Sequence, residues 1–133
     1  MAIEVTAFVR QISASTSEGS ARSHRVRCDR PEAKGGSDGG PMGGELFLIG
    51  LGGCFMSNLL AAIASREAGI TDVEVALSAQ LDGTPPRFTE IELQVSGVYQ
   101  DKEELEKLVI VAERGCIVAN TIKEAVVLKT RVK

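Results

Sequence analysis

The chain has 133 residues, of which 44% are hydrophobic and 25% are charged, and its formal net charge is −3. This length is sufficient for one domain with its own hydrophobic core, and the composition is that of a globular protein rather than a disordered one. The net negative charge excludes the strongly basic surface by which many proteins bind nucleic acid. We therefore expect a single domain over residues 1–133, without a nucleic-acid partner.

Three cysteines, Cys28, Cys54 and Cys116, lie far apart in the sequence. An odd number of distant cysteines is a poor basis for the disulfide framework of a secreted protein, and the N-terminus does not resemble a signal peptide. We therefore expect a cytoplasmic protein in which the cysteines are either reactive thiols or buried packing residues. Spacing alone leaves both alternatives open. The single histidine, His24, gives no cysteine–histidine ligand pattern, so we expect no metal site.

The first third of the chain predicts a hairpin followed by a long loop. Apolar and polar residues alternate over residues 2–10, which predicts a strand, and residues 22–28 predict a second strand antiparallel to it. Residues 13–20 are rich in Ser, Thr and Gly and predict a turn or loop. Six glycines and two prolines in residues 31–44 predict a long loop, and loops of this length are often functional.

The second predicted strand carries a cluster of basic residues. Because side chains alternate along a strand, we expect Arg25 and Arg27 on one face and Arg22 and His24 on the other. Such a cluster usually lies on a solvated surface. The alternative is that one of these arginines stabilises a thiolate.

Residues 45–68 predict a long helix that is almost entirely apolar. A transmembrane span is the alternative, but three glycines and two polar residues inside the segment favour a helix buried on all sides, and we expect no membrane association. The glycines are Gly50, Gly52 and Gly53, and each lowers helix stability by about 1 kcal/mol. We therefore expect a close packing partner there, such as a second chain.

The second half of the chain predicts a hairpin, a helix and a last strand. Residues 72–81 and 87–99 have strand patterns and are joined by a loop of Gly and Pro. The helix is expected over residues 102–115 after an N-cap at Asp101. Its apolar stripe consists of Leu105, Leu108, Val109 and Ala112. The last strand is expected over residues 125–132.

The predicted order of elements is ββαββαβ, with a long central helix and a second helix. Strands grouped before and after helices, and joined by short hairpins, indicate an α+β fold with a mainly antiparallel sheet. Cys116 lies about three turns beyond Leu105, so we expect it on the buried face of the second helix. Residues 117–124 are expected to add a further helical turn or two.

The glycine-rich loop and the long helix resemble the signature of the OsmC/Ohr family (osmotically inducible protein C and organic hydroperoxide resistance protein). The stretch Gly35–Cys54, GGSDGGPMGGELFLIGLGGC, is similar to the family pattern GG…GP.P.EL(L/F)…ALG.C. The second family cysteine corresponds to Cys116 in ERGCIVAN, where Ile117 stands in place of the family's usual proline. The predicted order of elements also resembles that of the family over essentially the whole chain.

This resemblance implies an intertwined homodimer and a thiol-dependent peroxidase that reduces organic hydroperoxides. Cys54 would attack the peroxide and become a sulfenic acid, and Cys116 would resolve it as a disulfide. An external dithiol such as dihydrolipoamide would then reduce the pair, without a bound cofactor. The alternative is a non-catalytic, dimeric OsmC-like protein that acts in a stress response or binds a small molecule.

The sequence departs from the pattern of active family members near the expected thiol site. The resemblance implies a glutamate directly before Glu45, paired with an arginine in the first hairpin loop, but Gly44 occupies the glutamate position. The loop 11–20 contains no arginine, and Arg10 and Arg22 flank it. The candidate activating residues are therefore Glu45, Arg10 and Arg22. For Glu45 the alternative is an acidic residue favoured by the first turn of the helix.

Overall fold

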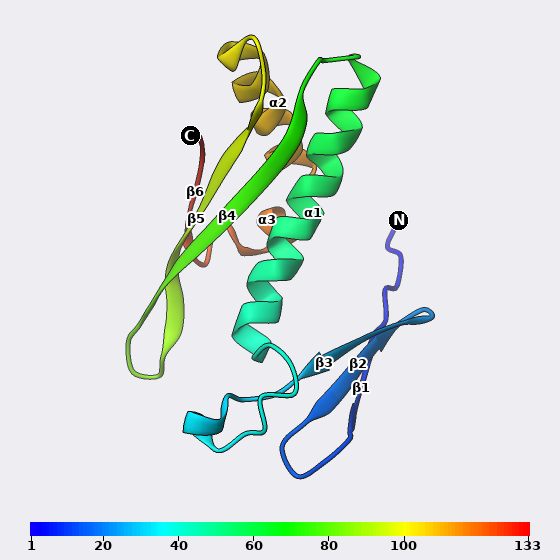
Figure 1. The fold of residues 1–133 in the computed structure, drawn as a ribbon, viewed down its shortest axis with the longest axis vertical. Helices are drawn as coiled ribbons and strands as arrows, with labels where there is room; N and C mark the ends of the chain where they lie inside the picture. Colours follow the sequence, from blue (N-terminus) through cyan, green and yellow to red (C-terminus); the bar gives the residue numbers. More distant parts are fainter. The chain divides into compact units, whose positions relative to one another are not determined.

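The structure is a computed structural model that describes all residues from 1 to 133. The chain is divided into two compact units, Met1–Phe47 and Leu48–Lys133. The α+β class predicted from the sequence is confirmed, with two three-stranded sheets and three α-helices (Figure 1). The predicted order lacked one strand in the first unit, and the further helical turns expected over residues 117–124 form a third helix in the second.

A three-stranded antiparallel sheet forms most of the first unit. It consists of β1 (Phe8–Gln11), β2 (Ser17–Ala21) and β3 (His24–Cys28), in this order. The loop expected over residues 13–20 was partly wrong, because Ser17 to Ala21 pair with β3 and most of them also with β1. The strand expected over residues 2–10 begins only at Phe8, since its partner strand ends one residue after the position opposite Phe8.

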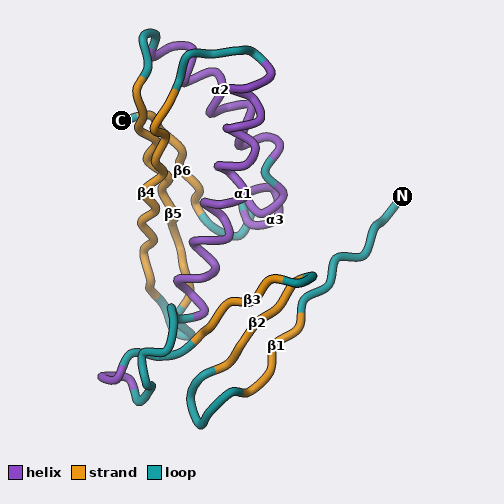
Figure 2. The backbone as a smooth tube through the Cα atoms, turned by 45° about the vertical axis from the view of Figure 1, so that its right-hand side comes forward, coloured by secondary structure: helices purple, strands orange, loops and turns teal.

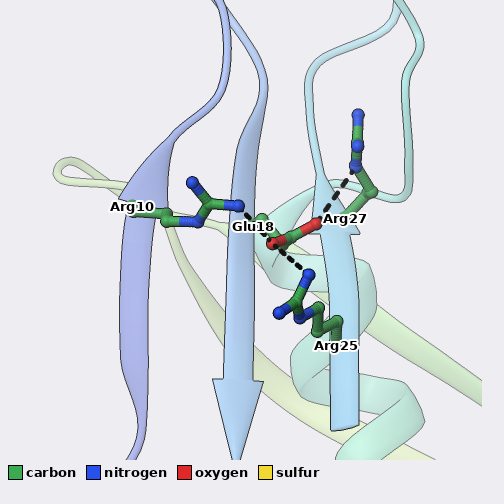
Figure 3. A network of polar contacts seen from close by, with 4 residues as sticks. All are labelled: Arg10, Glu18, Arg25 and Arg27. Atoms are coloured by element: carbon green, nitrogen blue, oxygen red, sulfur yellow. Dashed lines mark hydrogen bonds and ion pairs between the residues drawn. The ribbon is translucent and has the colours of Figure 1, made fainter.

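Charged side chains cover one face of this sheet. Glu18 lies in the middle strand and its carboxylate contacts Arg10 at 3.0 Å, Arg27 at 3.6 Å and Arg25 at 4.0 Å (Figure 3). A hydrogen bond from Arg10 is the main cause that lowers the pKa of Glu18. Arg25 and Arg27 therefore share one face of the strand, as the alternation of side chains predicted.

The glycine-rich loop is held to the sheet by one buried carboxylate. Asp29 follows β3 and is 4% exposed. Its oxygens accept hydrogen bonds from the Thr16 hydroxyl at 2.7 Å and from three backbone N–H groups, those of Arg30, Ser37 and Gly39. Burial alone would raise the pKa of Asp29, but these donors outweigh it and hold the pKa well below 3.8. The loop expected over residues 31–44 is thus anchored, and its only regular element is the short 3-10 helix η1 (Glu32–Lys34).

The second unit contains a mixed sheet. The strands β4 (Thr71–Asp82) and β5 (Arg87–Val98) form the predicted hairpin, and β6 (Val127–Val132) pairs with β5 in the parallel direction. We expected a mainly antiparallel sheet and did not predict this parallel pair. It arises because α2 (Lys102–Gly115) and α3 (Ile117–Ile122) carry the chain back to the start of β5 before it enters the sheet again.

The helices lie on one face of this sheet and the opposite face is open (Figure 2). The buried side chains of β5 are Ile91, Leu93 and Val95, which alternate with partly exposed polar residues. This alternation is what a sheet covered on one face requires. The apolar stripe predicted for α2, consisting of Leu105, Leu108, Val109 and Ala112, is buried against the same core.

The central helix α1 (Gly43–Ser65) is buried on one side only. Its buried stripe consists of Leu51, Gly52, Phe55, Leu59, Ala62 and Ile63. On other sides Ile49 and Leu60 are 57% and 52% exposed, so the expectation of a helix buried all round was wrong for the single chain. By length and composition alone α1 could cross a membrane. This is weak support for such a role, because the core helix of a soluble protein passes the same test.

Only one of the three helix glycines meets a close neighbour within the chain. A Cβ added at Gly52 would lie 2.7 Å from a methyl group of Leu77 in β4. Gly52 therefore lets α1 approach the sheet closely. A Cβ at Gly50 or Gly53 would meet nothing within 4 Å. The close partner expected at these two positions is not provided by the chain itself.

Replacement of Asp29 by Asn is expected to make the first unit less stable at neutral pH and less sensitive to acid. The lowered pKa means that the Asp29 carboxylate contributes stability above about pH 4 and loses it as the pH falls below its ordinary value of 3.8. Thermal unfolding between about pH 2 and 7 should therefore show a shallower acid loss in Asp29→Asn. Hydrogen exchange at the amides of Ser37 and Gly39 should be faster.

The control is Asp38→Asn, the same chemical change at an exposed carboxylate of the same loop, where a positive φ of 54° suits asparagine. It should behave as the wild type. Equal acid sensitivity of the Asp29 variant and the wild type would contradict this assignment.

Candidate functional site

Cys54 lies at the edge of the buried stripe of α1. Leu51 and Phe55 are almost completely buried and fix the rotation of the helix about its axis. Cys54 follows Leu51 by three residues and directly precedes Phe55, so its thiol is partly buried beside the core. The side chain of Asn58, one turn later, donates to the Cys54 carbonyl at 3.1 Å.

Cys116 lies in the turn between α2 and α3 and is completely buried. Its backbone is extended, with φ −79° and ψ 110°, so it ends α2 and serves as the N-cap of α3. Its sulfur accepts a hydrogen bond from the N–H of Ala119 at 3.4 Å. The expectation of a buried Cys116 is confirmed, and the helical turn expected after it is α3.

The structure brings Cys54 and Cys116 together within the second unit. Each of the two thiols is among the causes that shift the pKa of the other, so they lie close enough to interact. The backbone N–H groups of Val118 and Ile117 are also among the causes that lower the pKa of Cys54. All three cysteines of the chain are free thiols in this structure.

These contacts move the pKa values of the two thiols in opposite directions. Burial raises the pKa of Cys54, but the N–H of Val118, the thiol of Cys116 and the N–H of Ile117 together outweigh it and lower the pKa below 9.0. Burial is also the main cause that raises the pKa of Cys116; the N–H of Ala119 lowers this pKa, and the neighbouring Cys54 sulfur raises it. Cys54 therefore ionises first, while Cys116 keeps its proton.

Sequence reasoning could not find the N–H donors of Ile117 and Val118. They are backbone groups, so no side-chain motif reports them. Their position depends on where α2 ends, and helix ends are uncertain from sequence. The one available signal was Gly115 directly before Cys116, because glycine often marks the end of a helix.

The three candidate activating residues lie in the first unit and have other partners or an exposed position. Glu45 accepts a hydrogen bond from the N–H of Met42 at 2.8 Å, which is the geometry of an acidic residue that caps the start of a helix. Arg10 is paired with Glu18. Arg22 is exposed in the turn between β2 and β3, with a φ of 55°.

An apolar cavity of about 440 Å³ lies along the first sheet. Its lining includes Val9 of β1, Gly19 of β2, and Val26 and Cys28 of β3. These lining residues lie on the face of the sheet opposite to the one that carries Glu18 and its arginines, since side chains alternate along the strands. The structure contains no group of three or more His, Cys, Asp or Glu side chains that could hold a metal ion.

Comparison with known proteins gives a family match over most of the chain. A family model described as OsmC-like protein matches residues 35–131, a range that includes both thiols of the second unit. The chain belongs to the OsmC-like family. No curated protein matches this OsmC-like sequence significantly.

Solved structures have the same OsmC-like fold over nearly their whole length. The OsmC-like protein from Mycoplasma pneumoniae has a TM-score of 0.86 at 14% identity, and the match covers 100% of this chain and 98% of that one. An organic hydroperoxide resistance protein OsmC from Legionella pneumophila has a TM-score of 0.75 at 22% identity, with coverage of 98% and 97%. For OhrB of Bacillus subtilis the TM-score is 0.69 at 20% identity, with 98% of each chain covered. At these identities the similarity establishes the fold alone.

The opposite pKa directions predict that the two thiols react at different rates. When the reduced protein is treated with iodoacetamide, Cys54 should be alkylated at a pH below the ordinary thiol pKa of 9.0, because its pKa is lowered and only the thiolate reacts. Cys116 should react slowly even above pH 9.0, because its pKa is raised and it is buried. Mass spectrometry of the separate peptides measures both rates against pH. Faster labelling of Cys116 than of Cys54 would contradict the assignment.

Proposed function

We propose that this OsmC-like protein is a thiol-dependent peroxidase that reduces organic hydroperoxides, with Cys54 as the attacking thiol and Cys116 as the resolving thiol. One observation carries the proposal: Cys54 and Cys116 belong to the same core cluster and interact there, with the pKa of Cys54 lowered and that of Cys116 raised. Attack on a peroxide needs a thiolate, and resolution needs a second thiol beside the first. Organic hydroperoxide resistance proteins of the same fold agree with this chemistry.

The reaction divides into three steps. The Cys54 thiolate attacks the outer oxygen of ROOH, the O–O bond breaks, and the alkoxide leaves and takes a proton to give ROH and a Cys54 sulfenic acid. The sulfur of Cys116 then attacks the sulfenic sulfur, a disulfide forms, and the hydroxyl leaves with the Cys116 proton as water. An external dithiol, such as dihydrolipoamide, exchanges with this disulfide and returns both thiols while it becomes a cyclic disulfide.

The proposal assigns no step to Glu45, Arg10 or Arg22. Glu45 is engaged in capping α1 and Arg10 in the contact with Glu18. No cofactor is assigned, because both electrons for the peroxide come from the dithiol. We place the reaction in the cytoplasm, where free cysteines stay reduced.

Substitution of the attacking thiol is expected to stop peroxide reduction. With dihydrolipoamide present, Cys54→Ser should reduce cumene hydroperoxide no faster than the dithiol alone. Cys116→Ser should complete the first step and accumulate a sulfenic acid that dimedone traps at Cys54. The matched control is Cys28→Ser, which removes a thiol of the first unit and should turn over like the wild type.

Absence of turnover in protein whose thiols are verified as free would overturn the peroxidase proposal. The non-catalytic OsmC-like alternative would then stand, and the apolar cavity of the first unit favours it. Its volume of about 440 Å³ is within the range of small-molecule sites. Under that alternative, mild peroxide should leave Cys54 and Cys116 as free thiols.

We also propose that the protein is an intertwined homodimer. The first unit buries no apolar side chain, whereas Val9, Phe8 and Val26 are 67%, 66% and 47% exposed. The central helix α1 likewise exposes apolar side chains on the sides that do not face the core. Apolar surfaces of this extent are rarely left in water. A second copy is the occupant that the family resemblance implies.

A charge on the apolar face of the first sheet is expected to weaken the dimer. Light scattering during size-exclusion chromatography should give twice the chain mass of 14.1 kDa for the wild type. In Val26→Glu an unpaired carboxylate would enter the interface, so the dissociation constant should rise about 100-fold or more. Val26→Ile keeps the face apolar and should remain dimeric. A monomeric wild type would contradict the proposal.

A further inference from the structure

The two sulfurs of the thiol pair differ in whether a molecule from outside reaches them. Cys116 is completely buried, whereas Cys54 is only partly buried. We propose that the external reductant attacks the oxidised pair at the sulfur of Cys54 and not at that of Cys116. This inference rests on the proposed function, in which the two cysteines form a disulfide. It adds the sulfur at which the return to the reduced state begins.

Cys116 is closed to an external thiol by its position in the core. Its exposed fraction is 0%, and so is that of Ala112, four residues earlier on the buried face of α2. Its sulfur accepts a hydrogen bond at 3.4 Å from the N–H of Ala119, which is itself buried. A thiolate must contact the sulfur that it attacks, so the rate of thiol–disulfide exchange depends on access. A second chain docked on this unit covers further atoms, so Cys116 stays inaccessible in the proposed homodimer.

Cys54 lies beside a part of α1 that has no side chains. Gly53 directly precedes it, and Gly50 lies four residues earlier, on the turn toward which a helical side chain leans. A Cβ added at either glycine would meet nothing within 4 Å. Neither residue therefore covers Cys54 on the side away from the core. The first step of the proposed reaction needs the same access, because the peroxide must reach this sulfur.

The pKa values of the two thiols favour the opposite choice. Thiol–disulfide exchange is faster when the sulfur that leaves has the lower pKa. The pKa is lowered at Cys54 and raised at Cys116, so attack at Cys116 would expel the better leaving group. Burial prevents that attack, since no part of Cys116 is exposed. Access and leaving-group ability thus predict different intermediates, which an experiment distinguishes.

Reduction of the disulfide then takes place in two exchanges. One thiolate of the reductant bonds to the Cys54 sulfur, the bond between Cys54 and Cys116 breaks, and its electron pair leaves with the Cys116 sulfur, which takes up a proton. The second thiol of the reductant gives its proton to water and attacks the reductant's first sulfur, and Cys54 leaves as a thiolate. The reductant loses two electrons and becomes a cyclic disulfide, and the protein gains these electrons. The intermediate is a mixed disulfide at Cys54.

The test identifies the cysteine that carries the mixed disulfide. Wild-type protein is oxidised with diamide, which forms disulfides without a peroxide, and is then mixed with the monothiol β-mercaptoethanol, which lacks the second thiol needed to complete reduction. Acid added after increasing times stops the exchange by protonating thiolates. Mass spectrometry of the separate peptides should find the adduct at Cys54 and none at Cys116. An adduct at Cys116 would overturn the inference.

Two single-substitution variants measure the same access in the reverse direction. With glutathione disulfide, Cys116→Ser should form a mixed disulfide at Cys54. In Cys54→Ser the buried Cys116 should react about 100-fold or more slowly, because it must wait for the core to open locally. The control is the same pair of variants in guanidinium chloride, where the difference should disappear, and Cys28 provides the reference peptide in every sample. Equal rates in the folded variants would contradict the assignment.

These outcomes separate this inference from the peroxidase proposal, because neither measurement uses a peroxide. Absence of peroxide turnover together with an adduct at Cys54 would overturn the peroxidase proposal alone. An adduct at Cys116 in a protein with normal turnover would overturn this inference alone. A protein in which diamide forms no disulfide between Cys54 and Cys116 would overturn both.

Discussion

The burial of one stripe of α1 is the constraint on which the candidate site depends. Leu51, Phe55 and Leu59 are all but inaccessible to water, so the helix cannot rotate without exposing them. That fixed rotation holds Cys54 at the border between core and surface. The same core contains Cys116 and Ala119, so it also fixes the turn that faces Cys54. Apolar packing thus holds Cys54 and Cys116 near each other, where each thiol shifts the pKa of the other.

The two units of the chain are stabilised by different forces. Every buried apolar side chain lies in the second unit, whereas the buried residues of the first unit are Thr16, Glu18 and Asp29. Hydrogen bonds and ion pairs define the shape of the first unit, but they contribute little net free energy in water. A second copy that covers its apolar face would supply the hydrophobic contribution that it lacks.

Much of the fold could be predicted because local patterns determined it. The apolar stripe of α2, its N-cap at Asp101 and the hairpin of β4 and β5 depend on residues close in sequence, and the structure contains all three. The parallel pairing of β6 with β5 could not be predicted, since it depends on the path of the chain between them. The strand β2 was missed because Ser and Gly have low strand propensity, and pairing on both sides overrides that preference.

The candidate site was predictable in its side chains and not in its backbone. The resemblance to the family gave Cys54 and Cys116, and the structure brings their thiols together. Sequence reasoning looked for an activating group among charged side chains, and so considered Glu45 and Arg10. The sequence does not show that Glu45 accepts a hydrogen bond from the N–H of Met42, or that Arg10 pairs with Glu18, because the folded loop and sheet determine these contacts. The residue at which a helix begins determines which backbone N–H groups have no partner within the helix.

The parallel pairing of β5 and β6 has a consequence for the lifetime of the protein. The segment that contains Cys116 begins after β5 and ends at β6, two strands that pair in the same sheet, whereas Cys54 lies in α1. A disulfide between them would close a loop of about 60 residues, which lowers the entropy of the unfolded chain by the equivalent of about 4 kcal/mol. The oxidised protein would resist heat and proteases better than the reduced one. After exposure to peroxide the protein would stay in this more stable form until a dithiol reduces the disulfide.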